Sequence, residues 1–400
     1  MFLFRTSFTS DIQSPLLTDF FTIQRIFMFI SPQNRCVDFS VHMLYNDYET
    51  FHILRKRKWL DEAMATMKDV AKEAGLSLGT VSNVINNLST VTEENRMKVM
   101  EAIKKLKYRP NIAARTLKTN TSKSIGLIIP DITNPFYPEL ARGVEDAARE
   151  FGYTVFLCNN DRDAIKERQY SDAFVEKNVD GIILVKSSLT YSVLNEIAEK
   201  CKIVLIDYSG ENPQFDSIDV DDYKGAIQAM TFLHQNSHQR IAFIGGVPDS
   251  KSSKSRMQAY VNFLNEKKLK IDDLLIKEGR FDWQSGYNAA LELLNLPIPP
   301  TAIFAANDLM AIGAIKAIRE RHLQVPYDIS VIGYDDIGMA ALCTPELTTI
   351  RQPKYEMGTL SVEMLIKRVE NAIVEETVKI IKKVMDTTLI VRESVGSTEK

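Results

Sequence analysis

Seven short apolar runs alternate with amphipathic stretches in the region from residue 124 to residue 336. The runs are SIGLIIP (124–130), YTVFLCN (153–159), GIILV (181–185), KIVLID (202–207), RIAFIGG (240–246), TAIFAAND (301–308) and ISVIGYDD (329–336). Segments of helical periodicity, such as 138–151 and 221–235, separate them. Continuous apolar strands are typical of parallel sheets that helices cover on both faces. We therefore predict an α/β fold with parallel sheets for this part of the chain.

The region before these strands follows a helical pattern instead. A short amphipathic segment, 67–74, ends at Gly75, which suits a left-handed C-cap, and Ser77 can cap a second helix almost at once. A third helix is predicted over 93–106, with Thr92 as its N-cap. The residues predicted to close its side of a small core are Met97, Met100, Ile103 and Leu106. Since two helices joined by a Gly-containing turn form a helix-turn-helix unit, we predict an all-α headpiece.

The second helix of this unit has an uncharged outward face. The residues that we predict to contact DNA from it are Ser77, Leu78, Gly79, Thr80, Ser82, Asn83 and Asn86. An Asn amide can both donate to and accept from adenine, and Leu78 can pack on a thymine methyl group. An acidic side chain here would repel the phosphates. We therefore predict that this helix lies in the major groove of double-stranded DNA, the alternative being a solvated helix of a small bundle.

The charge distribution favours the DNA interpretation. The whole chain has a net charge of −3, but residues 67–120 hold ten Lys or Arg against five Asp or Glu. Within that window the stretch 104–118 contains no acidic residue. Its cations are Lys104, Lys105, Lys107, Arg109, Arg115 and Lys118. We expect this stretch to lie against phosphates and to make binding sensitive to salt.

The runs MKDVAKEAGLSLGTVSNVINN (67–87) and VTEENRMKVMEAIKKLKYRPNIAARTLKT (91–119) resemble the headpiece and hinge of the LacI/GalR family of bacterial transcription regulators. The resemblance extends from Met64 to the end of the chain. It implies a homodimer, in which each headpiece binds half of a pseudopalindromic operator and Leu78 and Gly79 contact bases. The family usually has Arg in TVSRV, where this chain has Asn83, and this departure bears on which operator sequence is bound.

The resemblance also assigns a hinge to residues 110–122. In the family this segment folds only on the operator, and its implied DNA contacts here are Asn111, Ala114 and Leu117. The residue that corresponds to Leu117 inserts into the central minor groove. A basic linker without this role is the alternative.

Polar residues follow several of the predicted strands. Asp131 and Asn134 follow the first, and Asp207 follows the fourth. Because parallel sheets bind ligands beyond the carboxyl ends of their strands, such residues are expected to share one cleft. Carboxylates and amides there suit a neutral polyhydroxy ligand, to which an Arg donates and on which an aromatic ring stacks. Asp308 and Asp336 are expected to cap helices instead.

These segments resemble the effector-lining segments of a type I periplasmic-binding-protein-like core, which has two Rossmann-like parallel-sheet subdomains joined by three crossovers. The effector contacts that the resemblance implies are Phe136, Asp207, Arg256, Phe281, Asn307 and Asp335. The expected effector is a sugar or sugar derivative, with a purine-type ligand as second choice. No cofactor and no metal are expected, and the four Cys have no paired spacing.

Residues 1–63 are expected to lie outside the folded protein. They hold nine of the 19 Phe without periodicity, and a start at Met64 would explain them. The division expected for the rest is a headpiece (64–109), a hinge (110–122) and a core (123–400), with an N-subdomain (123–222 and 354–381) and a C-subdomain (223–350 and 382–400). The sequence shows no membrane span and no secretory signal, so a cytoplasmic protein is expected.

The sequence thus favours a ligand-regulated repressor, dimeric or tetrameric, without enzyme activity. No nucleophile with its base and no phosphate-binding glycine motif is visible. An exported solute-binding protein of a transporter is the alternative, because the same core serves such receptors. That alternative accounts for residues 124–400. It does not account for the headpiece, and it would require an export signal, which the sequence does not show. An enzyme built on doubly wound sheets is a third hypothesis.

Overall fold

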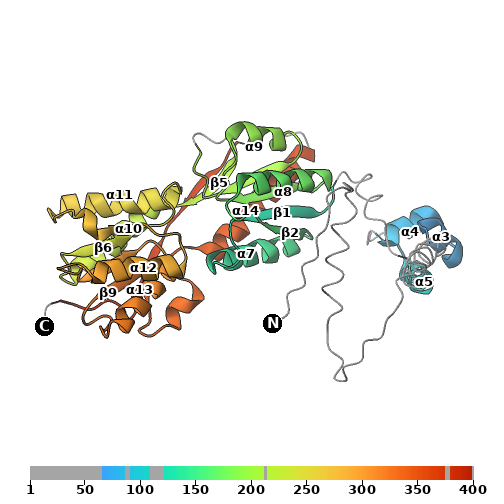
Figure 1. Ribbon diagram of the computed structural model, residues 1–400. Helices are drawn as coiled ribbons and strands as arrows, with labels where there is room; N and C mark the ends of the chain where they lie inside the picture. The colour runs from blue at the N-terminus through green and yellow to red at the C-terminus, as the bar shows by residue number, and fades with distance from the viewer. Residues whose placement is uncertain (1–64, 86–90, 109–120, 211–213, 374–378, 399–400) are drawn as a thin grey trace, which may run out of the picture. The chain divides into compact units, whose positions relative to one another are not determined.

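The computed structural model describes residues 65–85, 91–108, 121–210, 214–373 and 379–398 (Figure 1). The chain divides into two compact units, with the boundary between Pro110 and Asn111. No helix in the described ranges is both long and apolar enough to cross a membrane. Four residues predicted to contact DNA lie outside these ranges, namely Asn86, Asn111, Ala114 and Leu117.

The first unit contains the predicted helix-turn-helix. Its helices are α3 (Met67–Ala74), α4 (Leu78–Ile85) and α5 (Glu93–Lys105). Gly75 ends α3 with a φ of 65°, and the Thr80 amide donates to the Ser77 hydroxyl over 3.0 Å. Both predicted caps of the turn are therefore confirmed, and the turn orients α4 by local chemistry alone.

The core of the headpiece differs from the prediction in α5. Met97 and Met100 are 67% and 57% exposed, whereas Val99 and Ala102 are buried. In a helix, side chains three residues apart point in directions that differ by about 60°. A series of positions spaced only by threes therefore moves off the buried face within about two turns. Positions 99, 102 and 106, and likewise positions 99, 103 and 106, are separated by one step of three and one of four, so all four positions stay on one face. The prediction was wrong for Met97 and Met100, while Ile103 and Leu106 do pack against the core.

The second unit is built on two six-stranded sheets. The first contains, in spatial order, β11 (Lys382–Met385), β5 (Asp216–Val220), β4 (Lys202–Ile206), β3 (Gly181–Val185), β1 (Ser124–Ile129) and β2 (Thr154–Asn159). The second contains β12 (Thr388–Ile390), β10 (Thr348–Arg351), β9 (Ser330–Asp335), β8 (Ala302–Ala305), β6 (Ile241–Ile244) and β7 (Ile276–Lys277). Neighbouring strands are parallel except β10 and β12. The α/β prediction with two parallel-sheet subdomains is confirmed.

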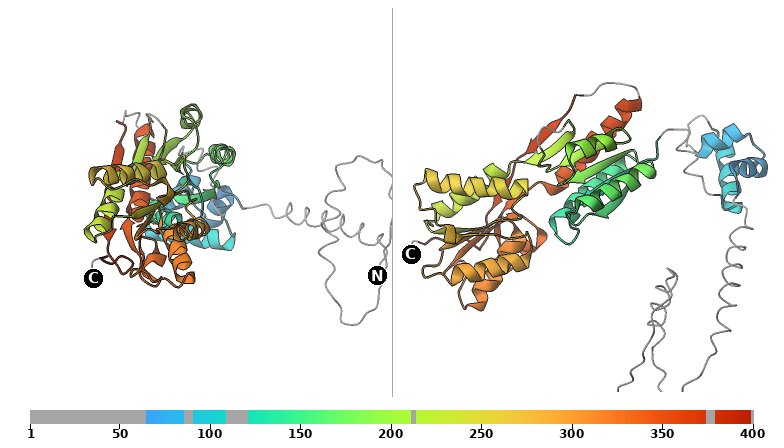
Figure 2. Two further views of the ribbon diagram at one scale, coloured as in Figure 1. Left: turned by 60° about the vertical axis from the view of Figure 1, so that its left-hand side comes forward. Right: turned by 45° about the horizontal axis from the view of Figure 1, so that its top comes forward.

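Helices cover both faces of each sheet, and each sheet with its helices forms one lobe of the unit (Figure 2). Those of the first lobe are α7 (Phe136–Glu150), α8 (Ala164–Glu176), α9 (Tyr191–Ala198) and α14 (Lys354–Ile373). Those of the second are α10 (Asp222–Gln235), α11 (Lys251–Glu266), α12 (Trp283–Leu294) and α13 (Asp308–Glu320). Two short 3₁₀ turns, Asp273–Leu275 and Gly338–Ala341, complete the elements. The α14 helix, close to the end of the chain, returns to the first lobe beside α7 (Figure 1).

Alternate residues of β4 show why the strand sequences are continuously apolar. Val204 and Ile206 pack under α7 and α14, whereas Ile203 and Leu205 pack under α8 and α9. Since successive side chains point to opposite faces, a strand between two helical layers must be apolar at every position.

The chain passes between the two sheets after β5, β10 and β11. We expected the last return to the second subdomain at residue 382, but Lys382–Met385 still pairs with β5 in the first sheet. The return therefore follows Met385. Residues KKVM form a short, exposed strand at the sheet edge and carry no continuous apolar run, so this strand could not be predicted from hydrophobic periodicity.

The contact between α7 and α14 depends on glycine. A Cβ built at Gly143 would overlap the Tyr355 carbonyl, and one at Gly358 would overlap the Leu140 carbonyl. The two helix backbones thus approach as closely as their atoms allow. This contact fixes α14, and with it the passage between the lobes that follows β10, to the first subdomain.

The substitution Gly143→Ala is expected to lower the free energy of unfolding by about 1–3 kcal/mol, because the added methyl group has no room. Urea denaturation followed by circular dichroism measures the change. The matched control is Gly338→Ala, since a Cβ there meets no atom within 4 Å. The control is expected to change stability by less than about 0.5 kcal/mol. Equal losses in the two variants would contradict the close helix contact.

Candidate functional site

The α4 helix presents a neutral face to solvent. Ser77, Leu78 and Gly79 are exposed, with Leu78 at 44%, and no acidic or basic residue lies in its first or last turn. Thr80, Ser82 and Asn83 are half-buried. The structure therefore leaves the amino-terminal end of α4 open to a partner, and it is this end of a recognition helix that contacts bases.

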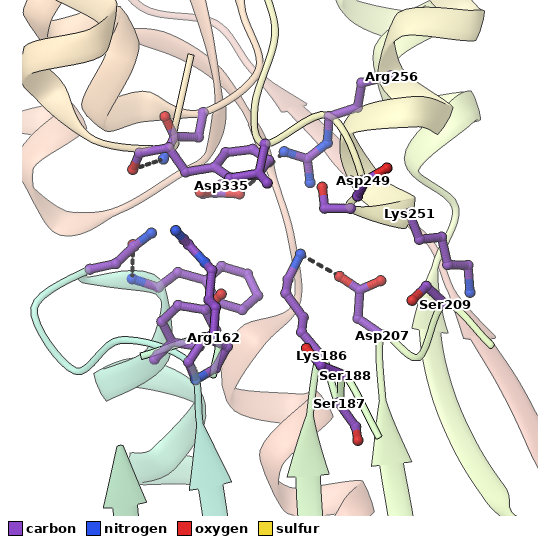
Figure 3. Close-up of a pocket in the computed structure, with 18 of the residues that line it drawn as sticks. Arg162, Lys186, Ser187, Ser188, Asp207, Ser209, Asp249, Lys251, Arg256 and Asp335 are labelled. Atoms are coloured by element: carbon purple, nitrogen blue, oxygen red, sulfur yellow. Dashed lines mark hydrogen bonds and ion pairs between the residues drawn. The ribbon is translucent and has the colours of Figure 1, made fainter. Parts of the chain in front are cut away.

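A cavity of about 380 Å³ lies in the second unit, at the carboxyl ends of strands from both sheets (Figure 3). All six predicted effector residues line it, namely Phe136, Asp207, Arg256, Phe281, Asn307 and Asp335. Lys186 and Asp207 rise from neighbouring strands of the first sheet, whereas Arg256 descends from a helix of the second lobe (Figure 3). Two lobes therefore supply facing halves of one polar cavity.

Several lining residues have a left-handed backbone. The φ angles are 52° at Lys186, 53° at Asp207, 63° at Phe281 and 114° at Asp335. Such a conformation costs on the order of 1–3 kcal/mol in a residue other than Gly, and it persists only where the surroundings hold it. Backbone hydrogen bonds do so here, since the Lys186 amide donates to Ile206 over 2.7 Å and the Asp207 amide to Ile218 over 2.9 Å.

Arg256 is the most deeply held cation of the cavity, with 3% exposure. Its Nε and Nη2 donate to one Asp222 oxygen over 2.9 and 2.7 Å, and its Nη1 donates to the Ala306 carbonyl. The guanidinium also lies 3.6 Å above the Tyr334 ring centroid. Burial alone would lower the pKa of Arg256, but Asp222, Tyr334 and Asp335 together outweigh burial and raise that pKa above its ordinary value. Arg256 is therefore a permanent, oriented donor.

Asp335 faces this guanidinium, with 3.9 Å between Oδ1 and Nη1. Gln352 donates to the same carboxylate over 2.6 Å. Burial raises the pKa of Asp335 to about 6, although Arg256 and Lys354 counteract it. At neutral pH the carboxylate is therefore ionised and can accept from a ligand hydroxyl.

A second charged pair, Lys186 and Asp207, lies on the first-lobe side. Nζ is 2.5 Å from Asp207 Oδ2 and also donates to the Ser252 hydroxyl over 2.9 Å. Burial would raise the pKa of Asp207, but the adjacent ammonium more than compensates and leaves that pKa lowered. Burial would lower the pKa of Lys186, but Asp207, with Tyr137 and Asp222, more than compensates and leaves that pKa raised. Both groups are therefore charged at neutral pH.

Phe281 provides an aromatic wall. A Cβ at Gly246 would overlap its ring, so that position must be glycine for the ring to lie there. The Phe281 carbonyl accepts from Asn307 Nδ2 over 3.1 Å, while Asn307 Oδ1 caps α13 through the Met310 amide over 3.0 Å. Asn307 is therefore both the cap of a helix and part of the cavity wall.

The caps expected at Asp308 and Asp336 are wrong. Asp308 is fully buried and accepts from the Ile337 amide over 2.8 Å, because Asn307 already occupies the capping position. Asp336 instead pairs with Arg351 and Arg392, each over 2.7 Å. Neither lines the cavity, as expected.

Several lining residues were not predicted from the sequence, among them Arg162, Lys186, Lys251 and Gln352. Lys186 directly follows the run GIILV, so the strand-end argument that identified Asp207 applied equally to it. Gln352 follows β10, which has no continuous apolar run and was not predicted as a strand. No group of three or more His, Cys, Asp or Glu in the described ranges is placed to bind a metal ion.

Comparison with known families gives two matches. A family described as bacterial regulatory proteins, lacI family, matches residues 66–111, and a periplasmic binding protein-like domain matches residues 230–395. The HTH-type transcriptional regulator RegA of Clostridium saccharobutylicum is 40% identical over 334 residues, which are 83% of this chain and 99% of that protein. The ribose operon repressor of Escherichia coli K12 is 40% identical over 309 residues, 76% of this chain and 93% of that protein.

Two solved structures are also similar. The lac repressor dimer bound to operator and the anti-inducer ONPF has a TM-score of 0.74 and 28% identity, over 84% of this chain and 100% of that one. A LacI family regulator from Enterococcus faecium with bound ribose has a TM-score of 0.63 and 30% identity, over 69% of this chain and 100% of that one.

Replacement of Asp335 by Asn tests the electrostatics of the cavity. The folded-state pKa of about 6 lies above the ordinary value of 3.8, so the folded chain binds this proton more tightly and the resulting stability is lost as pH rises through 6. The difference in unfolding free energy, wild type minus variant, is expected to fall by about 2 kcal/mol between about pH 4.5 and about pH 7.

Urea denaturation at the two pH values measures this difference. The matched control is Asp249→Asn, because that carboxylate lines the same cavity but its side chain is 99% exposed. The control should show a smaller pH dependence. A difference for Asp335→Asn that is constant with pH would contradict the proposed burial of an ionised carboxylate.

Proposed function

Because this chain belongs to the lacI family of bacterial regulatory proteins, we propose that it is a cytoplasmic repressor whose operator binding is controlled by a small sugar. The proposal rests above all on one combination. A helix-turn-helix with a neutral, exposed recognition face and a polar cavity between two lobes occur in the same chain. Each of the two features alone occurs in other classes of protein, but together they are what a ligand-controlled regulator needs.

Recognition of DNA is assigned to α4 and to the basic stretch 104–118. Leu78 and Gly79 are proposed to contact base edges, and Ser77, Thr80, Ser82 and Asn83 to contact phosphates or bases. Asn86 and the hinge residues Asn111, Ala114 and Leu117 keep the roles that the sequence implied. Asn83, in place of the usual Arg, is expected to favour a different base at its position.

The effector is proposed to be a neutral sugar. Asp207 and Asp335 accept from hydroxyls, Arg256 donates, and Phe281 provides an apolar wall for the C–H face of a ring. Three of the four lining cations are already matched by carboxylates, Lys186 by Asp207, Lys251 by Asp219 and Arg256 by Asp222. A cavity with so little unmatched charge favours a neutral ligand over an anionic one. The similarity to a ribose operon repressor supports the same class.

Control is proposed to act through the angle between the lobes. The ligand contacts both lobes, so binding selects one relative angle, and this changes the spacing of the two hinges in a homodimer. Operator and effector then influence each other's affinity equally. The direction of the effect, release or retention of DNA, follows from which angle fits the operator.

The competing functions explain less. A solute-binding protein of a transporter accounts for the cavity but not for residues 66–111, which match a DNA-binding family. An enzyme would need a reacting group, whereas three of the four cations that line the cavity are engaged in ion pairs with carboxylates. The similar proteins are transcriptional regulators, which is consistent with a protein that has no enzyme activity.

Footprinting of genomic fragments with the purified full chain tests the proposal. The chain is expected to protect a small set of pseudopalindromic sites, and addition of D-ribose, D-glucose or D-galactose is expected to change that protection for at least one sugar. Absence of any preferred site under all these conditions would contradict the proposed function.

The variant Leu78→Ala tests the role of α4. Its affinity for a preferred site should fall by roughly ten- to a hundredfold, because an apolar base contact is lost, with little change on nonspecific DNA. The matched control is Met97→Ala, which removes another exposed apolar side chain of the headpiece, 67% exposed, outside α4. Equal losses for both variants in a gel-shift titration would exclude a specific role for Leu78.

The edge of the first sheet is proposed as part of the homodimer contact. β2 ends the sheet, and its Phe156 and Leu157 are 44% and 43% exposed. The following helix α8 exposes Ile165 to 70%. An apolar sheet edge with unpaired backbone groups is normally covered, and a second copy would cover it.

Substitution of Leu157 by Arg is expected to weaken the homodimer by at least about a hundredfold, because a charge would be buried without a partner. Sedimentation equilibrium measures the dissociation constant. The control Ile298→Arg changes an exposed isoleucine, 68% exposed, on a loop of the second lobe and should leave it unchanged. An unaltered dimer in Leu157→Arg would place the contact elsewhere.

A further inference from the structure

Lys186 contacts residues of both lobes from within the cavity. It directly follows β3 with its backbone φ at 52°, and its side chain reaches Asp207 at the end of the neighbouring strand β4. The same Nζ contacts Ser252 of α11, which belongs to the second lobe. The side chains of Lys186 and Asp207 are 23% and 10% exposed, so both charged groups are largely withdrawn from solvent yet open to the cavity (Figure 3).

The chemistry of this pair is complementary to that of two neighbouring hydroxyl groups. An ammonium only donates and an ionised carboxylate only accepts, whereas a hydroxyl does both. One hydroxyl can accept from Lys186 while the next along the ring donates to Asp207. Nζ and Oδ2 lie 2.5 Å apart, so two adjacent hydroxyl groups of one ring can each reach one of them at the same time.

The surroundings orient such a ligand. The Phe281 ring centroid lies 5.8 Å from Nζ, on the second-lobe side, and offers a flat apolar surface for the ring. The Ser252 hydroxyl is a weak, neutral partner of Nζ, and a ligand hydroxyl can replace it without leaving the ammonium unpaired. The Asp207 carboxylate, by contrast, must stay close to keep the charge balanced.

We propose that Lys186, paired with Asp207, determines specificity for a sugar ring that carries two adjacent hydroxyl groups. The inference rests on the proposed function and identifies the chemical feature by which the cavity distinguishes one sugar from another. Lys186 contacts the ligand directly, and removal of either hydroxyl from the ligand forfeits one charge-assisted hydrogen bond. Sugars without this pair of hydroxyls bind through the remaining contacts only.

Isothermal titration of the full chain with matched sugars tests the proposal. The probes are D-ribose paired with 2-deoxy-D-ribose, and D-glucose paired in turn with 2-deoxy-, 3-deoxy- and 4-deoxy-D-glucose, so that each adjacent pair of ring hydroxyls is broken in one of them. Wild type is expected to prefer the complete sugar of at least one pair by about tenfold or more, because a hydrogen bond to a charged group is lost in the deoxy sugar. Lys186→Met, of similar length but without the charge, is expected to reduce this preference to less than about threefold.

Ser252→Ala is the matched control, because it removes the neutral hydrogen-bond partner of Nζ and leaves the Lys186–Asp207 pair in place. It should keep the preference of wild type. Retention of the full preference in Lys186→Met, with operator binding and thermal unfolding unchanged, would overturn this inference and leave the proposed function intact. A wild-type chain that binds none of the six sugars would overturn the sugar effector, and this inference with it.

Discussion

A buried guanidinium organises the effector cavity. Arg256 is held by Asp222 at the start of α10, by the Ala306 carbonyl at the end of β8, and by the Tyr334 ring of β9. Three separate segments of the second lobe thus converge on one charge. Because an unpaired charge at such depth costs several kcal/mol, each of these segments must stay in place, and the cavity wall is rigid before any ligand arrives. The position of Asp335 opposite Arg256 follows from the same constraint.

The first lobe is connected to this rigid wall by direct contacts of Lys354. Lys354, at the start of α14, is buried and donates to the Asp335 and Asp336 carbonyls over 2.6 and 2.9 Å, while it pairs with Glu139 of α7 over 3.2 Å. The close packing of α14 on α7 at Gly143 then ties this lysine to the whole first lobe. A shift of the Asp335 backbone would therefore displace Lys354 and, through Glu139, α7. These direct contacts are the physical basis for regarding the two lobes as coupled.

Strands β3 and β4 were predictable because each is a continuous apolar run buried on both faces. Strands β5 and β10 are also largely buried, but they contain Asp, Ser or Thr and were not recognised. The short edge strands β7 and β11 escaped prediction since little of them is buried. Residues that follow a recognised strand, such as Asp207, could be assigned to the cavity. Gln352 could not, because its strand was not recognised, and the exposed Met97 shows that spacing must alternate threes and fours to define a helix face.

Coupling between the effector cavity and the operator through the two lobes is measured most directly by its reciprocity, that is, by the effect of each ligand on the affinity for the other. The affinity of the full chain for its operator is determined with and without a saturating sugar that binds, and the affinity for that sugar is determined with and without saturating operator. The account predicts that the two ratios are equal and differ from one by roughly five- to a hundredfold. An affinity for the sugar that operator leaves unchanged would contradict it.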